Sequence, residues 1–167
     1  MATDMFLKLD GIKGESQDDK HKDEIEISSY SFGASNFVKI SANGRSGAGK
    51  ASFQDFHFVM RTNKSSPTLM LSCVSGKHID SAVLSVRKAG ASQDYVQYTF
   101  SDVLITSFQT GGASSDQGST DQVSLNFVKF ESDYTPSDAN GKFLDPIKAF
   151  WDVQANVEIP PLPGTIG

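Results

Sequence analysis

A glycine-rich stretch comes closest to a known catalytic motif in this chain. Residues 44–50 read Gly-Arg-Ser-Gly-Ala-Gly-Lys, which matches the G-x-x-x-x-G-K loop that binds nucleotide phosphates through backbone amides and a lysine. Such a loop requires a serine or threonine next, whose hydroxyl holds Mg²⁺, and then a helix. Ala51 follows instead, and the alternation after it is that of a strand. The sequence therefore favours a flexible loop with an exposed Lys50 over a nucleotide site.

The other residues that could do chemistry form no recognisable set. His21, His57 and His78 lie in unrelated segments without the spacing of metal ligands, and we expect His21 to be solvated and His57 to face outward. Cys73 is the only cysteine, which excludes an internal disulfide and a C-x-x-C redox or zinc site. The nucleophile motif G-x-S-x-G is absent. We therefore expect no catalytic residues, no metal and no cofactor.

Composition excludes two classes of partner. The chain has 167 residues, enough for one domain, and 15 Lys+Arg against 20 Asp+Glu give a net charge of −5. This balance lacks the basic surface that nucleic acids or anionic membranes need. No apolar run is long enough to span a bilayer, and the first residues lack the pattern of a Sec signal peptide. We expect a soluble protein made in the cytoplasm.

Alternation of apolar and polar residues predicts a mainly β fold. The clearest case runs from Ile147 to Ile159, which predicts one long strand with Trp151 on its buried face. Several strands slip by one residue, as where Phe127 gives way to Val128, and such slips predict bulges or barrel corners. The other alternating apolar sets are Met5, Leu7 and Leu9; Ile25 and Ile27; Ala82, Leu84 and Val86; Val96, Tyr98 and Phe100; Val123, Leu125 and Phe127.

One segment, at about residues 66–75, breaks this pattern and predicts a single helix. Ser66 can cap it, Pro67 suits its first position and Gly76 suits the residue after its end. The apolar stripe expected to face the core consists of Leu69, Met70, Cys73 and Val74.

The remaining stretches predict loops within one domain. Residues 11–22, 37–50 and 111–119 are polar or rich in glycine, and the second is long for a compact domain, which is typical of functional loops. We expect the domain to cover residues 1–159 and the Pro/Gly tail, residues 160–167, to be disordered. Long strand edges without an active site favour closure against further copies of the chain into a ring.

The segments taken together resemble the haemolysin-coregulated proteins (Hcp), the tube subunits of bacterial type VI secretion. The opening, Met5 to Ser16 with Asp18 to Ile25, carries the resemblance, and it continues in register to about Val157. The other matching stretches are Ala48-Gly49-Lys50, Ser66 to Met70 with Ser75 to His78, Val86 to Gly90, Val103 to Ser107 with Thr110 to Gly112, Val123 to Phe127, and Tyr134-Thr135-Pro136.

This resemblance implies both a fold and a role. The fold is a small β-barrel of two antiparallel sheets with one flanking helix, and six copies of it close into a ring. Rings stack into a hollow tube, which a contractile sheath propels, behind a spike protein, into a neighbouring cell. The lumen of the ring also holds small effector proteins, which implies a carrier role and secretion by the type VI route.

The resemblance also assigns roles to individual residues. The loop over residues 37–50 corresponds to the extended loop that reaches the neighbouring ring, and here its stacking residues are Asn43, Gly44, Arg45, Gly47, Gly49 and Lys50. Its middle departs from the Gly/Met-rich versions of the family by carrying Asn43 and Arg45. Ser31 matches a small residue of the lumen that contacts effectors in relatives; the alternative is a plain solvent-facing serine on a strand.

Other functions remain open at this point. A monomeric ligand-binding β-module, such as a sugar-binding sandwich, predicts a monomer with a shallow aromatic site, whereas the aromatic residues here are scattered. An effector-bearing relative would need a C-terminal toxin domain, and the eight residues after Ile159 leave no room for one.

Overall fold

The computed structural model describes residues 2–37, 39–40, 46–47 and 49–159. Its elements are β1 (Thr3–Leu9), β2 (Ile25–Glu26), β3 (Ser29–Ser31), β4 (Ala34–Asn36), β5 (Lys39–Ile40), β6 (Ser46–Gly47), β7 (Ala51–Phe53), β8 (Phe56–Arg61), α1 (Ser66–Ser75), β9 (His78–Lys88), β10 (Val96–Gly111), β11 (Thr120–Asn126), β12 (Lys129–Tyr134), β13 (Ile147–Asp152) and β14 (Val157–Glu158). Within these residues the prediction of a mainly β fold with a single helix at 66–75 is confirmed.

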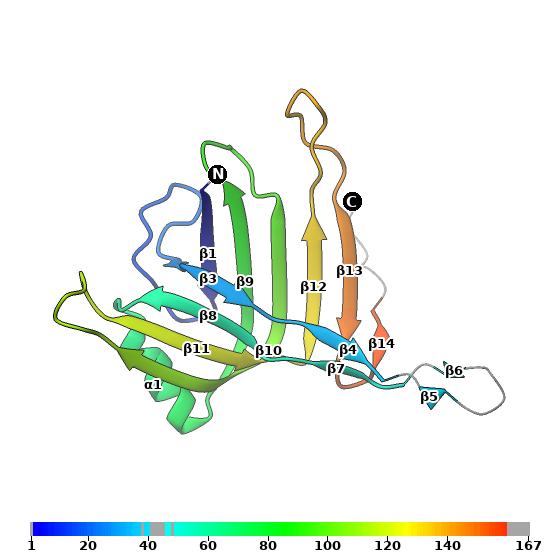
Figure 1. Ribbon diagram of the computed structural model, residues 1–167, viewed down its shortest axis with the longest axis horizontal. Helices are drawn as coiled ribbons and strands as arrows, with labels where there is room; N and C mark the ends of the chain where they lie inside the picture. The colour runs from blue at the N-terminus through cyan, green and yellow to red at the C-terminus, as the bar shows by residue number, and fades with distance from the viewer. Residues whose placement is uncertain (1, 38, 41–45, 48, 160–167) are drawn as a thin grey trace.

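The long strand β10 joins two antiparallel layers. Its first half pairs with β9 and β12, and its second half pairs with β11, with a register shift inside this pairing between Ile105 and Ser107. Figure 1 shows the result, with β1, β9, β10, β12 and β13 upright at the back and β3, β8 and β11 crossing in front of them. A bulge increases local bend and twist, which allows one strand to serve both layers.

Residues 25–31 connect the two layers on the other side. Ile25 and Glu26 pair with β1, and Ser29 to Ser31 pair with β8. Between them the Ile27 amide donates to the Met5 carbonyl at 3.1 Å and the Ser28 amide donates to the Val59 carbonyl at 2.7 Å. Backbone hydrogen bonds thus join neighbouring strands from β2 through β1, β9, β10, β11 and β8 to β3, and the chain itself connects β2 to β3, which gives the outline of a small barrel.

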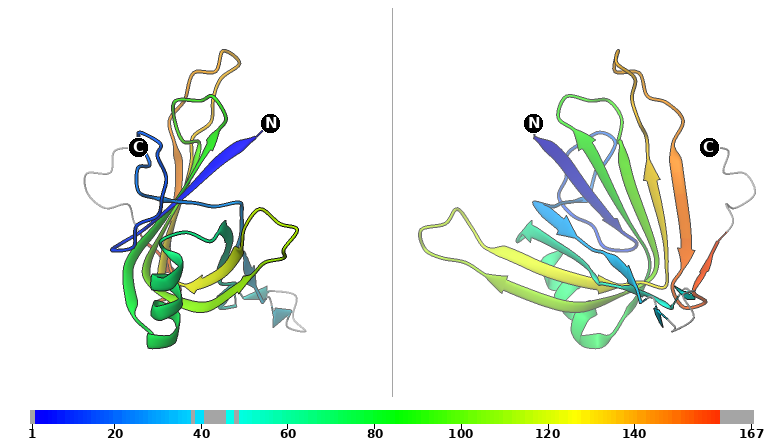
Figure 2. Two further views of the ribbon diagram at one scale, coloured as in Figure 1. Left: turned by 90° about the vertical axis from the view of Figure 1, so that its left-hand side faces the viewer. Right: turned by 45° about the vertical axis from the view of Figure 1, so that its right-hand side comes forward.

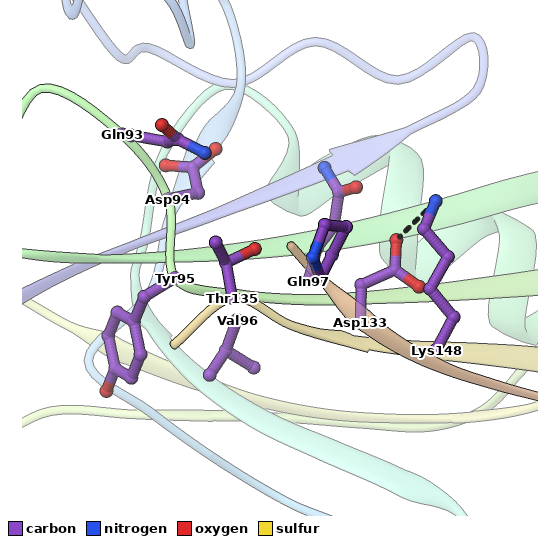
Figure 3. Close-up of a pocket in the computed structure, with 9 residues that line it drawn as sticks. Gln93, Asp94, Tyr95, Val96, Gln97, Asp133, Thr135 and Lys148 are labelled. Atoms are coloured by element: carbon purple, nitrogen blue, oxygen red, sulfur yellow. Dashed lines mark ion pairs between the residues drawn. The ribbon is translucent and has the colours of Figure 1, made fainter. Parts of the chain in front are cut away.

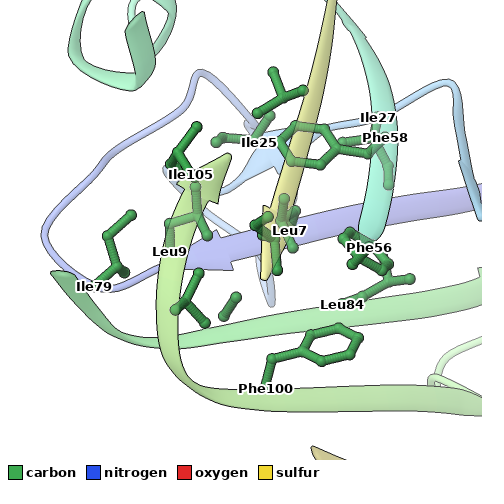
Figure 4. Packing of buried hydrophobic residues seen from close by; sticks show 14 of the residues in the cluster. Leu7, Leu9, Ile25, Ile27, Phe56, Phe58, Ile79, Leu84, Phe100 and Ile105 are labelled. Carbon is green, nitrogen blue, oxygen red and sulfur yellow. The ribbon is translucent and has the colours of Figure 1, made fainter. Parts of the chain in front are cut away.

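The core fills the space between the two layers (Figure 4). Side chains from every strand of the barrel meet there, and the largest, Phe56, Phe58 and Phe100, are fully buried. The one-residue slips in the apolar pattern mark the places where the chain changes layer or strand. Phe127, for example, lies between the end of β11 and the start of β12.

The helix begins and ends close to the predicted residues, but its rotation differs from the prediction. Gly76 follows the helix with a φ of 66°, as expected of a C-terminal glycine, and Pro67 lies in the first turn. The N-cap residue is Ser65, and its side chain makes no capping bond. Ser66 instead donates its hydroxyl to the buried carboxylate of Asp121 on β11, at 2.5 Å.

This contact fixes which face of the helix is inside. Leu69 is fully buried and Cys73 packs against the core, as predicted. The prediction is wrong for Met70 and Val74, which are 46% and 77% exposed. Because Ser66 is tied to Asp121, the turns after it bring Leu69 and Ser72 inward and carry the other apolar residues outward.

Strands β12, β13 and β14 continue the back layer past the barrel, and we call residues 129–158 the wing. The predicted single strand from Ile147 to Ile159 is wrong. β13 ends at Asp152, whose carboxylate accepts the Ala155 amide at 2.8 Å, and Asn156 takes a φ of 56° in the turn before β14. Trp151 is half-buried.

The long glycine-rich loop is largely a β-hairpin. β4 pairs with β7, and β5 pairs with β6 nearer the tip. This hairpin, residues 34–53, which we call the arm, extends β3 and β8 away from the barrel (Figures 1 and 2). Its paired strands replace part of the loop predicted over residues 37–50. No helix in the described part of the chain is long and apolar enough to cross a membrane.

Candidate assembly surfaces

The arm carries the residues that the sequence analysis assigned to stacking. Asn43, Gly44 and Arg45 lie outside the described residues. Gly47 lies in β6 opposite Lys39, and Lys50 is exposed directly before β7. The segment after Lys50 is a strand, as predicted, whereas a phosphate-binding loop would lead into a helix.

Gly49 has a structural reason to be glycine. A Cβ atom built there would collide with the carbonyl oxygen of Phe37 on the facing side of the hairpin. The clashing atom belongs to the backbone and cannot move aside as the end of a flexible side chain can. Any larger residue at position 49 must therefore open the hairpin at this point. The shape of the arm therefore depends on Gly49.

The base of the arm is anchored to the wing. The ring of Phe53 lies 5.3 Å from the ring of Phe130, and the Asn156 side-chain oxygen accepts the Ala51 amide at 3.2 Å. Beyond this base, Phe37 is 84% exposed. The arm thus has a fixed root and an apolar side chain available to a partner.

Ser31 lies in a row of small polar residues that crosses the front layer. The register places Ser31 opposite His57, His57 opposite Ser124, and Ser124 opposite Ser107. Nδ1 of His57 lies 3.0 Å from the hydroxyl oxygen of Ser124, so His57 faces away from the core, as predicted. Ser31 itself is exposed.

The same face continues in a second polar set. Asp55 accepts hydrogen bonds from the Thr106 hydroxyl at 2.8 Å and the Asn126 amide at 3.1 Å. Sequence reasoning missed these rows, because their members lie on strands far apart in the chain and only the register aligns them. The outer face of the front layer is therefore polar and made mostly of small side chains.

The outer face of the back layer is charged and is covered by residues 11–24. The prediction that His21 is solvated is wrong, since only 6% of the residue is exposed. Its Nδ1 lies 2.8 Å from Glu24, its Nε2 lies 3.1 Å from Asp94, and its ring stacks on Phe6 at 4.4 Å. A solvated loop was expected because nothing in the sequence places Asp94, 73 positions away, beside His21.

Arg87 on β9 holds the same segment through Asp18 and also contacts the Phe6 ring. Its guanidinium lies 5.4 Å from the centre of the Phe6 ring and donates two hydrogen bonds to the carboxylate of Asp18. The hydrogen bond from Arg87 lowers the pKa of Asp18 to about 2. Burial raises the pKa of Glu24.

A pocket of about 250 Å³ opens where the β9–β10 loop meets the wing (Figure 3). Lys148 lies in it, 3.6 Å from Asp133 and 3.8 Å from Glu131. Burial, with Asp133 beside it, raises the pKa of Glu131. None of the residues lining the pocket is a serine, cysteine or histidine, so the arrangement is that of a partly buried ion pair.

Comparison with known proteins identifies the family. A family model described as type VI secretion system effector, Hcp, matches residues 6–134. The chain belongs to the Hcp family. It is 40% identical over 161 residues to the protein hcp1 of Pseudomonas aeruginosa, with 95% of this chain and 99% of the relative covered. Hcp proteins are structural components of type VI secretion systems and not enzymes.

Solved structures of Hcp proteins share the fold. The crystal structure of Hcp1 from Salmonella typhimurium superimposes with a TM-score of 0.80 at 36% identity, covering 95% of this chain and 100% of that one. A type six secretion system protein superimposes with a TM-score of 0.89 at 27% identity, with the same coverage. The barrel, wing and helix of this Hcp chain are therefore family features.

Proposed function

We propose that this Hcp chain is the subunit of a hollow type VI secretion tube, in which six copies close into a ring and rings stack. The observation that carries the proposal is the front layer, an antiparallel sheet in the order β3, β8, β11, β10. Its polar outer face would line the lumen, with Ser31 among the residues that contact small effector proteins.

The two edges of this front layer support ring closure. Among the described residues, positions 105–111 of β10 pair with β11 only, and β3 pairs with β8 only. Because neighbouring strands alternate in direction, a β3 placed beside the β10 of another copy would be antiparallel to it. Each copy thus offers two different edges, and a contact between unlike surfaces closes into a ring when the rotation permits.

The arm supports stacking. It continues the direction of β3 and β8, whereas edge pairing extends the sheet across its strands, so the arm would project along the tube axis (Figure 1). Residues 34–54 contain Lys39, Arg45 and Lys50 and no acidic residue, in a chain whose net charge is −5. Basic charge and the exposed Phe37 suit a contact with the acidic surface of the next ring.

The remaining partners follow from the same role. A tube would carry a spike protein at its tip, lie inside a contractile sheath and leave the cytoplasm by the type VI route. In this proposal the lumen carries small effectors, and neither nucleic acid nor a membrane takes part.

Light scattering and negative-stain images of one sample test the proposal. We expect about six times the subunit mass, ring-shaped particles and, at high concentration, stacks of rings. A stable monomer at micromolar concentration would contradict it and would favour the alternative of a monomeric ligand-binding module.

A further inference from the structure

The helix α1 presents more apolar side chain to solvent than to the core. Met70, Leu71 and Val74 are 46%, 63% and 77% exposed and form one stripe along the helix. The inward face carries Leu69 and Cys73 together with two serines, Ser66 and Ser72. Among the described residues nothing covers the outward stripe. A helix with an apolar face turned outward is typical of an interaction surface.

The wing carries a second apolar surface of the same kind. One cross-strand row runs from Val86 through Val96 and Tyr134 to Ile147. Val86 is 3% exposed, whereas Tyr134 is 48% and Ile147 is 67% exposed. The row keeps its apolar character across four strands, but the barrel's own front layer covers only the part inside the barrel. The wing therefore extends a core-type face beyond the core.

The two apolar surfaces lie far apart on the molecule. Figure 1 shows α1 at the lower left, beneath the second half of β10, and the end of β12 with the start of β13 in the upper part, slightly right of the centre. Two surfaces that lie apart in this way cannot cover each other within one copy. They can do so between successive copies related by a rotation.

The charges around the two surfaces are opposite in sign. Residues 61–78, which contain the helix, include Arg61, Lys64 and Lys77 and no acidic residue. Residues 129–159, which contain the wing, include three lysines and six acidic residues. Glu131, Asp133 and Lys148 pair with one another on the other face of the wing, which leaves four acidic residues and two lysines. Complementary charge around an apolar centre is the usual arrangement of a specific interface.

We propose that the outward stripe of α1 in one copy packs against the exposed face of the wing, at Tyr134 and Ile147, in the next copy. The proposal rests on the ring described under Proposed function and names the residues of its subunit contact. α1 lies directly behind the free edge of β10, so the same neighbour that pairs with β10 would bring its wing against α1. The contact buries apolar side chains that each copy alone leaves in water.

Engineered cysteines test the contact directly. Val74→Cys and Ile147→Cys are combined in a Cys73→Ala background, and mild oxidation is followed by a non-reducing gel. We expect a ladder of covalent oligomers up to the ring, because every copy carries both halves of the contact. Either cysteine alone, and the control pair Val74→Cys with Asn140→Cys at the tip of the β12–β13 loop, should give no ladder.

The outcomes separate this proposal from the ring itself. Rings by light scattering before oxidation, without a ladder after it, would overturn the helix–wing contact and leave the ring standing. Monomers before oxidation would overturn both. A ladder from the control pair equal to that from the test pair would show unspecific contact and would also overturn the proposal.

Mixing two broken variants tests that the contact joins unlike surfaces. One variant carries Leu71→Asp with Ile147→Cys, and the other carries Ile147→Asp with Val74→Cys, both without Cys73. Each alone should remain uncross-linked, because one half of its contact is broken. The mixture retains one intact contact and should give covalent dimers, at least tenfold more than either variant alone, and no larger species. Each variant has one cysteine and can form at most a covalent dimer. As much dimer from either variant alone as from the mixture would contradict the proposal.

Discussion

The barrel and the wing use the same kind of residue in the same cross-strand rows, with opposite results. Val86 in the barrel is 3% exposed, whereas Ile147 in the wing, three strands along the same row, is 67% exposed. Residue type and alternation do not differ between them. What differs is the front layer, which covers the barrel and, through the base of the arm, Phe130 of the wing, but leaves Tyr134 and Ile147 uncovered. Alternation therefore predicts that one face of a strand is buried, but it does not predict whether the same chain or another copy buries it.

The largest expected effect contrasts a core residue with a wing residue. Phe100→Ala should lower the free energy of unfolding by about 3–5 kcal/mol, because it leaves a cavity among fully buried rings. Ile147→Ala should change it by about 0.5 kcal/mol or less and should instead reduce the fraction of rings. Urea unfolding measures the free energy of unfolding of both variants in a Leu71→Asp background, where we expect monomers. Light scattering without Leu71→Asp measures the fraction of rings. Equal destabilisation by both would show that the wing is covered within its own chain.

The second-largest effect is expected at Asp121, whose buried carboxylate sets the rotation of α1. Asp121→Ala leaves the hydroxyls of Ser66 and Thr62 without their acceptor and should cost about 2–3 kcal/mol of stability in urea unfolding. The exposed Asp116 provides the matched control, since Asp116→Ala should be near neutral. If the helix rotates in the variant, ring formation should fall as well. An unchanged unfolding midpoint would contradict this account of the helix.

Acid should loosen the segment that covers the back layer. The pKa of Asp18 is about 2 in the folded chain, below its ordinary value, so its ion pair contributes stability above about pH 4 that is lost as the pH falls towards 2. The difference in unfolding free energy between the natural chain and Asp18→Asn should therefore be constant near neutral pH and shrink below pH 4. Asp19→Asn, an exposed neighbour, is the control. A difference that stays constant down to pH 2 would show that Arg87 does not hold the carboxylate.

The arm should affect assembly more than folding. Gly49→Ala places a Cβ against the Phe37 carbonyl and should shorten stacks of rings in negative-stain images while single rings persist. We expect a loss of stability of about 1 kcal/mol or less, because the arm contributes little to the core. Gly112→Ala, just after the end of β10, adds a Cβ at ordinary contact distance from Ser119 and should leave stack length unaltered. Stacks of normal length in Gly49→Ala would count against the arm.

The smallest effect is expected at the polar face. Ser31→Gln should leave stability within about 0.5 kcal/mol and rings intact, because Ser31 is exposed on the outer face of the front layer. Its effect should appear in the amount of small effector that co-purifies with rings. Loss of the ring itself would place Ser31 at a subunit contact and not in the lumen.

Local pattern was sufficient for much of the fold. The alternation predicted a mainly β fold, Pro67 and Gly76 predicted the limits of α1, and the resemblance predicted the family, all of which are confirmed. The single strand predicted from Ile147 to Ile159 is the exception, because a turn divides it. The predictions failed where a contact with a residue far away in the sequence set the local structure. Ser66 binds Asp121 in place of capping the helix, and Asp94 draws His21 out of solvent. Neither partner can be found from spacing, because both contacts join residues more than fifty positions apart.

The sequence by itself determined that this chain is mainly β, has one helix and carries the segments of an Hcp protein, because these properties depend on residue type, period and order. Only the tertiary structure decided which apolar faces are covered and which are left open. It aligned Ser31 with His57, Ser124 and Ser107, and it turned Met70 and Val74 outward. The burial of apolar faces and the alignment of side chains across strands depend on strand register and helix rotation. Both are set by contacts between parts of the chain that are far apart in sequence.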